Sequence, residues 1–319
     1  MSRWYRWWAS LWNRQESPLS LAWVRIGLSA VIAMDLLKMG ALELPGWLWA
    51  EAAFGGLWDL SERARPPELS MLFALTPTVA WGLWAVLLGS VACFGAGLFT
   101  RLSGLIFLML YAQSAILNDP SDRAIDRLIR LVFILLIFSR CGDTLSLDAR
   151  RRTGSFWGDG APIPSWPRYL IIVQMVMVYW GAGLAKTSIY WFPWGGYSAL
   201  YVILQDPIYA TRDWSFLGHP ALFPLTQLGT AMTHLWELSA PILVFAFHYR
   251  DTRLRKGRIR SLLNRLDARL LFVGLGVVFH LLLMMSLRLG IFPLAMLSLY
   301  PVFFHPDELQ SAWRRLRPG

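Results

Sequence analysis

The chain has 319 residues, of which 56% are hydrophobic and 16% are charged, with 18 Trp and a formal net charge of +10. Soluble domains carry about 25% charged residues, so this composition excludes an ordinary soluble protein and indicates an integral membrane protein. The basic residues are spread over short loops between apolar segments, a topology signal, so nucleic acid is not expected as a partner.

The predicted elements begin with residues 1–18, where mixed Arg and Trp indicate a helix lying on the membrane surface. Residues 19–305 form an all-α bundle of about eight membrane-spanning helices, and residues 306–319 form a basic cytoplasmic tail. The predicted spans are 19–40, 77–99, 102–118, 124–140, 168–187, 223–247, 268–287 and 290–305. The fourth and eighth are short, and a buried, tilted or re-entrant helix is the alternative at both places.

The distribution of Lys and Arg predicts the orientation of the bundle. About two thirds of the basic residues fall on one side if the spans alternate, and positive loops face the cytoplasm. They lie at positions 3–14, 101, 140–168, 250–269 and 314–317. We therefore expect both termini in the cytoplasm and, for a bacterial protein, location in the inner membrane with the lipid bilayer as the main partner.

Polar residues at the outer ends of the spans form a first group of candidates. Asp35 lies in the outer part of the first span, Asp126 in the outer part of the fourth, and Lys186 at the outer end of the fifth. These residues could line one outward-facing polar vestibule. Alternatively, each is a separately solvated helix end, and Asp126 with Arg130 is an ordinary i,i+4 pair.

Lys186 is the principal candidate. It ends the apolar segment 168–187 and precedes the aromatic loop SIYWFPWGGY at 188–197. An ionisable group near hydrocarbon is costly and is a functional candidate, although a lysine at a helix end can also extend to interfacial water. Trp191 and Trp194 belong either to an aromatic belt at the membrane surface or to a lid over an apolar ligand.

Three residues are predicted deeper in the membrane. His234 and Glu237 are i,i+3 on the sixth span and face one way, and His280 lies at similar depth on the seventh. A buried carboxylate is expected to be paired or protonated, here with a histidine or with Arg25. No metal site is expected, because the chain offers few carboxylates for one. The three residues are therefore expected to form either a structural hydrogen-bond network or part of a substrate pocket.

Several segments, in order, resemble one membrane family. They are WVRIGLSAVIAMDLL (23–37), GLFTRLSGLIFLML (97–110), DRLIRLVFILLIFSRCGDTLSLD (126–148), YWGAGLAK (179–186), HLWELSAPIL (234–243) and FHLLLMMSLRLGIFPLAML (279–297). The chain is similar to the horizontally transferred transmembrane (HTTM) proteins and to the membrane domain of vitamin K-dependent gamma-glutamyl carboxylases.

The resemblance implies a catalytic role for Lys186. In the carboxylases the matching lysine is regarded as the base that deprotonates vitamin K hydroquinone, whose anion then reacts with oxygen. An amine removed from water holds its proton less tightly and can act as a general base near neutral pH. The implied cofactor is a reduced quinone such as vitamin K hydroquinone.

Three departures limit what the resemblance carries over. Ala185 stands where the carboxylases have a second lysine, the segment 118–127 lacks their histidine, and the chain ends at Gly319 where they continue into a large domain. Two functions therefore remain. One is a carboxylase- or epoxidase-like enzyme acting on a quinol-type ligand. The other is a non-enzymatic protein that assists maturation or export of a secreted peptide.

Overall fold

The computed structural model describes residues 13–57, 59, 68–251 and 256–316. The interfacial helix predicted at residues 1–18 falls largely on residues 1–12, outside this part of the chain. The fold is 72% helical. Within the described residues, its one sheet pairs β1 (Gln15–Glu16) antiparallel with β2 (Ile163–Pro164). The chain divides into two compact units, Met1–Ile171 with Ser298–Gly319, and Ile172–Leu297.

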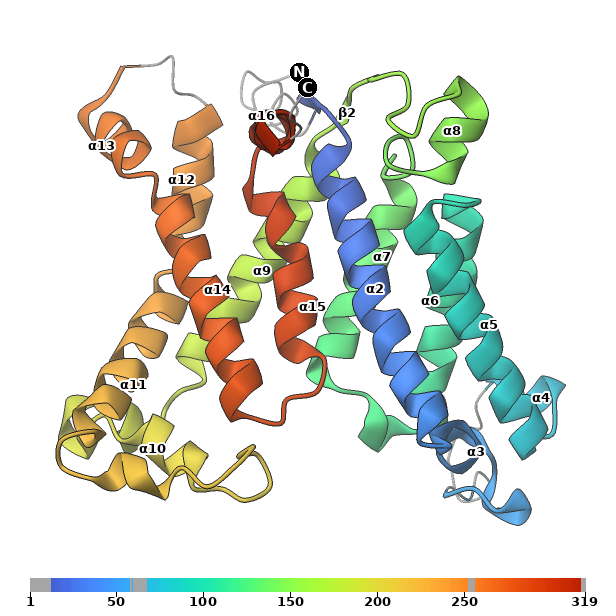
Figure 1. The fold of residues 1–319 in the computed structure, drawn as a ribbon, viewed down its shortest axis with the longest axis horizontal. Helices are drawn as coiled ribbons and strands as arrows, with labels where there is room; N and C mark the ends of the chain where they lie inside the picture. Colours follow the sequence, from blue (N-terminus) through green and yellow to red (C-terminus); the bar gives the residue numbers. More distant parts are fainter. Residues whose placement is uncertain (1–12, 58, 60–67, 252–255, 317–319) are drawn as a thin grey trace, which may run out of the picture. The chain divides into compact units, whose positions relative to one another are not determined.

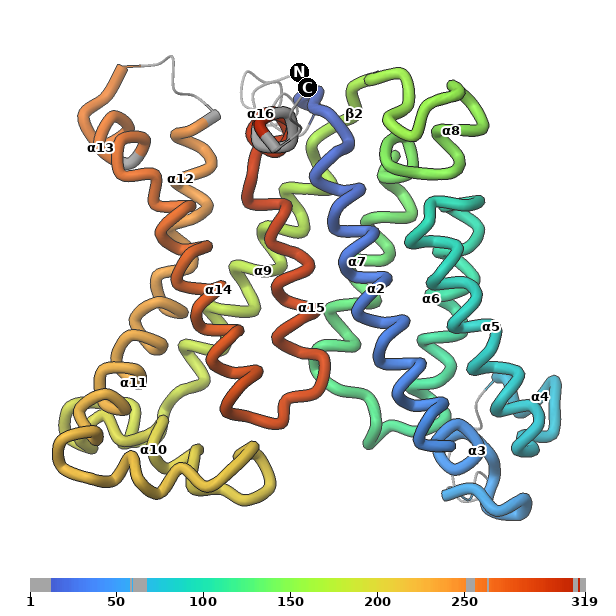
Figure 2. The backbone as a smooth tube through the Cα atoms, viewed as in Figure 1, coloured from blue at the N-terminus to red at the C-terminus, as the bar shows by residue number. Residues whose placement is uncertain are grey.

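The first unit is a row of apolar helices (Figures 1 and 2). Helix α2 packs on α5, α5 on α6, and α6 on α7. Their bounds are α2 (Leu19–Ala41), α3 (Leu44–Trp49), α4 (Glu68–Leu72), α5 (Pro77–Ala96), α6 (Thr100–Leu117), α7 (Ala124–Phe138), α8 (Leu147–Thr153) and α16 (Pro306–Leu316). The core joins Phe94, Phe107 and Phe133, which are fully buried, with centroid separations of 4.8 Å for Phe94–Phe133 and 4.5 Å for Phe107–Phe133.

Local signals fix the ends of α5. Thr76 caps its start, accepting a hydrogen bond from the N–H of Val79, and Pro77 occupies the first helical position, where no N–H is needed. The helix ends at Gly97, whose φ of 69° suits glycine, and a Cβ there would lie 2.2 Å from the Cβ of Ser146. The helix is therefore shorter than the predicted 77–99.

A buried ion pair ties three parts of the chain together in this unit. Arg168 donates to Glu16 at 2.8 Å and to the carbonyl of Val302 at 3.1 Å, beside the pairing of β1 with β2. Helix α16 also packs on α2. The first and last described elements of the chain therefore lie at one end of α2, the end at which α8 also lies (Figure 1).

The second unit contains the later helices. These are the end of α9 (Trp166–Leu184), α10 (Ala199–Leu204), α11 (Phe223–Leu238), α12 (Ile242–Asp251), α13 (Arg258–Leu266), α14 (Ala268–Ser286) and the start of α15 (Phe292–Leu299). Its core includes Tyr179, Trp236 and Phe272, with ring centroids 4.7 Å apart for Tyr179–Trp236 and 4.8 Å apart for Trp236–Phe272. Helices α11 and α12 meet at a 55° bend beside Pro241, whose missing N–H interrupts a helix.

All eight predicted spans are helical over most of their length. By length and composition, four helices of the described residues are candidate membrane spans: α2, α5, α6 and residues 258–286, with α11–α12 a fifth if the bent pair is one span. Helix α7 has 15 residues and α15 continues to Phe303 only through a 3-10 turn, so both are short, as expected. Helix α9 is long enough but carries Arg168, Gln174 and several aromatic residues, which lower its hydropathy. Eight crossings therefore remain a prediction.

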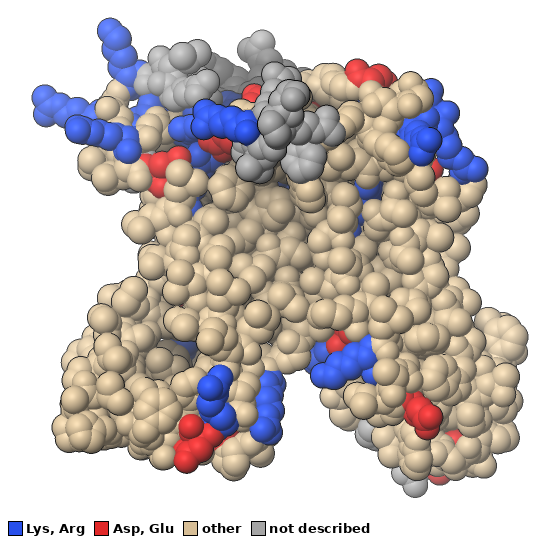
Figure 3. All heavy atoms as spheres, viewed as in Figure 1, with Lys and Arg blue, Asp and Glu red and all other residues tan. Residues whose placement is uncertain are grey.

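These helices expose a large amount of apolar surface. Large apolar side chains such as Leu102, Met109, Leu271 and Leu282 are exposed. In each unit, most of the charged side chains on the face seen in Figure 3 gather near the helix ends, and the surface between them is mostly uncharged. Exposed apolar helices with charged ends suit a bilayer, where backbone groups must be satisfied within the helix.

Candidate functional site

Lys186 lies just beyond the end of α9, in the second unit. Its side chain donates to the carbonyl of Ala182 at 3.3 Å and forms an ion pair with the carboxylate of Glu237 on α11. The Lys186 side chain is 16% exposed and that of Glu237 is 5% exposed. The pair is therefore nearly buried, with its remaining opening on the lysine side.

A glycine brings these two helices close enough for the pair to form. A Cβ on Gly183 would lie 3.1 Å from the backbone nitrogen of Leu238 and 3.2 Å from the Cβ of Glu237. These distances are tighter than ordinary contacts, so a larger residue would push α9 and α11 apart. Gly181, in contrast, faces open space. The spacing of Gly183 and Lys186 thus sets the approach of the lysine to Glu237.

The aromatic loop covers the amine. The Nζ of Lys186 lies 4.8 Å from the ring centroid of Trp191, a cation–π distance. The rings of Trp191 and Phe192 lie 6.2 Å and 5.3 Å from the imidazole of His234, both edge-on. We call Lys186, Trp191, Phe192, His234 and Glu237 the Lys186 cluster.

Two hydrogen bonds fix the loop and the start of α10 to α11. The amide of Gln227 donates to the carbonyl of Gly196 at 2.7 Å, and the hydroxyl of Thr230 accepts from the N–H of Leu200 at 3.0 Å. Trp194 stacks on Phe192 with a centroid separation of 4.7 Å, but is 74% exposed. Trp191 therefore faces the amine, whereas Trp194 presents an aromatic face outward.

The prediction that Glu237 pairs with a histidine or with Arg25 is wrong. Glu237 is buried, as predicted, but its partner is Lys186, while His234 on the same helix packs among aromatic rings. His280 is fully buried and shares a 2.8 Å hydrogen bond with the hydroxyl of Tyr179. Glu237 and His280 therefore have different partners, Lys186 and Tyr179.

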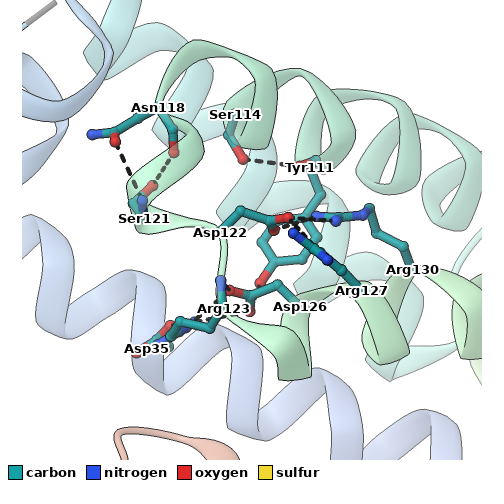
Figure 4. Close-up of polar contacts among 10 residues, drawn as sticks. All are labelled: Asp35, Tyr111, Ser114, Asn118, Ser121, Asp122, Arg123, Asp126, Arg127 and Arg130. Atoms are coloured by element: carbon teal, nitrogen blue, oxygen red, sulfur yellow. Dashed lines mark hydrogen bonds and ion pairs between the residues drawn. The ribbon is translucent and has the colours of Figure 1, made fainter.

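A second polar cluster lies in the first unit and contains Asp35 and Asp126 (Figure 4). Arg123 donates to Asp35 at 2.7 Å and to Asp126 at 2.9 Å, and the hydroxyl of Tyr111 donates to Asp126 at 2.6 Å. We call these four residues the Arg123 cluster. It joins α2, α6 and the start of α7. Burial alone would lower the pKa of Arg123, but hydrogen bonds from its guanidinium to both aspartates outweigh burial and raise it, so the guanidinium stays charged.

The neighbouring residues contradict the predicted i,i+4 pair. Arg130 donates two hydrogen bonds to Asp122, at 2.7 Å and 2.8 Å, whereas Asp126 is held by Arg123. The hydrogen bonds from Arg130 lower the pKa of Asp122, outweighing its partial burial. The loop before α7 therefore curls back over the first turn, and each aspartate pairs with a different arginine.

The two clusters belong to different units of the fold, and a shared vestibule for Asp35, Asp126 and Lys186 stays a prediction. The sequence had pointed to Lys186, Trp191, His234 and Glu237, which the structure brings together. It had not singled out Arg123, Tyr111 or Tyr179. The segment SDRAIDR (121–127) places Arg123 and Asp126 at i,i+3 spacing, and this was the available signal for Arg123.

Comparison with known proteins gives one family. The model of the HTTM domain matches residues 13–308, nearly the whole described chain and both clusters. No solved structure matches the chain.

Proposed function

The chain belongs to the HTTM domain family and is an integral membrane protein, and from the Lys186 cluster we propose that it is an enzyme acting on a quinol-type, lipid-soluble ligand with Lys186 as general base. The observation that carries this proposal is the nearly buried Lys186–Glu237 pair beneath the ring of Trp191. A structural ion pair needs neither an aromatic cover nor an opening toward the amine.

The chemistry of the pair suits proton abstraction. For Lys186 to act as a base, the proton of the pair must lie on Glu237, which leaves Lys186 as a neutral amine. Lys186 can then take the proton of a ring hydroxyl. The resulting ammonium stabilises the negative charge left on the ligand oxygen, because electrostatic attraction is strong where water is excluded.

The aromatic side chains around the amine are of the kind that would bind a flat ring. Trp191 lies over the amine, and His234 turns its imidazole toward Trp191 and Phe192. Trp191 would stack on the ring, while Lys186 and Glu237 would hold its hydroxyl end. A bound reduced quinone would supply an ionisable hydroxyl and two electrons for reaction with oxygen.

The presence of a lysine rather than an arginine at position 186 also supports a role for its amine as a base. The chain contains three lysines, Lys38, Lys186 and Lys256, among 30 basic residues. Arginine serves nearly everywhere else that a positive charge is placed. An arginine holds its proton too tightly to act as a base near neutral pH, whereas a lysine can release it.

We also propose that both termini face the cytoplasm of a bacterial cell, with the protein in the inner membrane. The support is that β1, α8 and α16 lie at one end of α2 (Figure 1), and that the basic residues of α8 share this end. Lys186 is at the far end of α9 from β2, so the proposed site opens on the outer side.

The test is oxygen consumption by the purified protein, in a bilayer disc, with a reduced prenylated quinone. We expect turnover by the parent protein, loss of at least ten-fold in Lys186→Arg, and parental turnover in the matched variant Lys38→Arg. All three proteins should melt at similar temperatures. Equal turnover by Lys186→Arg and the parent would refute the role of the base. Absence of turnover together with a copurifying secreted peptide would instead favour an accessory function in peptide maturation.

A further inference from the structure

A concave site lies in the first unit, where α6 begins and α7 ends. It is a pocket of about 550 Å³. Its lining residues are Phe99, Thr100, Arg101, Leu102, Ser139, Arg140, Gly142, Asp143, Asp148 and Arg152. Three arginines face two aspartates in this list, so the pocket is positive overall.

Both aspartates are already engaged by the protein. Asp148 accepts hydrogen bonds from the N–H groups of Phe99 and Thr100, at 2.9 Å and 2.8 Å, and from the Thr100 hydroxyl at 2.7 Å. It thus satisfies the start of α6, which needs no further anion. Asp143 holds Arg140 at 2.5 Å and Arg152 at 3.1 Å.

The arginines retain capacity for another anion. A guanidinium has five N–H donors, and Arg140 and Arg152 each give one close contact to Asp143. Their side chains are 44% and 47% exposed. Arg101 forms no ion pair with any described residue. Three guanidinium groups around one pocket match the planar, multidentate recognition of phosphate.

The wall of the pocket is fixed in place before any ligand binds. Arg25 is fully buried on α2 and donates to the carbonyl of Cys141 at 2.6 Å and to that of Leu145. The N–H of Asp148 bonds to the carbonyl of Gly97 at 2.8 Å. The segment between α7 and α8 is therefore held against α2 and α5, and ligand binding does not have to order it.

An apolar stripe leads away from the pocket along α6. Its exposed members recur at helical spacing: Phe99, Leu102, Leu105, Ile106 and Met109. Helix α7, which packs on α6, ends in a similar stripe of Leu131, Ile134 and Phe138, next to the pocket residues Ser139 and Arg140. The positive pocket thus meets apolar helix surface at its edge, and Lys and Arg side chains gather over α8 (Figure 3).

We propose that this pocket binds the phosphate headgroup of one anionic glycerophospholipid, with the acyl chains lying along the exposed stripe of α6. The ligand is chosen by charge complementarity and by the continuity of the arginines with lipid-facing surface. Basic pockets at membrane interfaces bind anionic headgroups. A free phosphate ion shares the headgroup chemistry but would make no use of the stripe.

The test is native mass spectrometry of the whole protein titrated with phosphatidylglycerol or phosphatidylcholine. We expect retention of one phosphatidylglycerol in preference to phosphatidylcholine, and an affinity about five-fold lower for each arginine removed. Arg140→Gln and Arg101→Gln are the pocket variants. Arg101→Gln breaks no described ion pair, so it reports on binding even if Arg140→Gln lowers stability.

The matched control is Arg150→Gln, on α8 but outside the pocket, where the guanidinium stacks on Phe156. It should bind as the parent does. An equal loss of phosphatidylglycerol binding in Arg150→Gln and Arg101→Gln would mean that the lipid is attracted by the basic surface in general, and it would overturn the proposal. Displacement of the lipid by millimolar inorganic phosphate, or equal retention of phosphatidylcholine, would also overturn it. Lys186→Arg should not change lipid retention, which separates this site from the proposed enzyme.

Discussion

Lys186 and Glu237 are 51 positions apart in the chain and form an ion pair where the end of α9 meets α11. The contact depends on Gly183, which leaves room for α11 against α9. Removal of either partner would leave a charge in a nearly water-free site, which is far costlier than the absence of both. Loss of one partner alone is therefore expected to destabilise the fold strongly.

The first prediction concerns that pair. Glu237→Ala should lower the free energy of unfolding by about 3–5 kcal/mol, because the ammonium of Lys186 loses its buried partner. The double variant Glu237→Leu, Lys186→Met should recover most of this loss. Thermal melting in detergent measures both effects. An exposed acid, Glu43→Ala, serves as the control. A Glu237→Ala protein as stable as the parent would show that the carboxylate is solvated.

The second prediction concerns the Arg123 cluster. Asp126→Ala removes the acceptor of the Tyr111 hydroxyl, of the Arg123 guanidinium and of the Arg123 N–H. Because Asp126 is buried, we expect a loss of about 2–4 kcal/mol from these charge-assisted hydrogen bonds. Arg127→Gln, at a side chain 75% exposed, should change stability by less than about 0.5 kcal/mol. Equal melting temperatures for Asp126→Ala and Arg127→Gln would contradict a stabilising role for Asp126.

The third prediction concerns pH and Asp148. Burial raises its pKa, but hydrogen bonds from Thr100 and Phe99 outweigh burial, and the pKa of Asp148 is lowered overall. A carboxyl whose pKa is lower in the folded state stabilises the fold fully above its unfolded value, about 3.9, and loses this contribution as pH falls through the folded value.

Melting curves between pH 7 and pH 3 check this sign. Asp148→Asn should be less stable than the parent near neutral pH by about 1–2 kcal/mol, and the difference should shrink below about pH 4. Asp119→Asn, at an exposed aspartate, should follow the parent throughout. If the difference in stability between Asp148→Asn and the parent grew as the pH fell, it would contradict a lowered pKa for Asp148.

Much of the fold followed from the sequence, because apolar runs and turn residues are local signals. The predicted span 77–99 differs from α5 only at its end, where Gly97 takes a left-handed conformation. The span 223–247 became a bent pair because Pro241 interrupts it. These differences lie at particular residues, and the order of the elements is unchanged.

The partners inside the clusters were harder to predict. Sequence position gives the depth of a residue along a helix, but the direction around the axis depends on which helices meet. A histidine or Arg25 was expected as the partner of Glu237, whereas the close approach of the helices at Gly183 places Glu237 beside Lys186. Likewise, Asp122 rather than Asp126 pairs with Arg130 because the loop before α7 folds back on the helix.

The fourth prediction concerns topology. Cysteines introduced at Arg258 on α13 and at Arg212 in the segment between α10 and α11 should be labelled from opposite faces of an intact cell, because positive segments face the cytoplasm. An impermeant maleimide should modify Arg212→Cys in whole cells and Arg258→Cys only after lysis. Labelling of both without lysis would refute the proposed orientation.

The most direct test of the central claim is mass spectrometry of the small molecules that copurify with the protein. We predict a prenylated quinone at close to one per protein, retained by Trp194→Leu and largely lost from Trp191→Leu, because Trp191 covers Lys186 whereas Trp194 faces outward. A secreted peptide with no quinone, or equal quinone in both variants, would contradict a quinol site at Lys186.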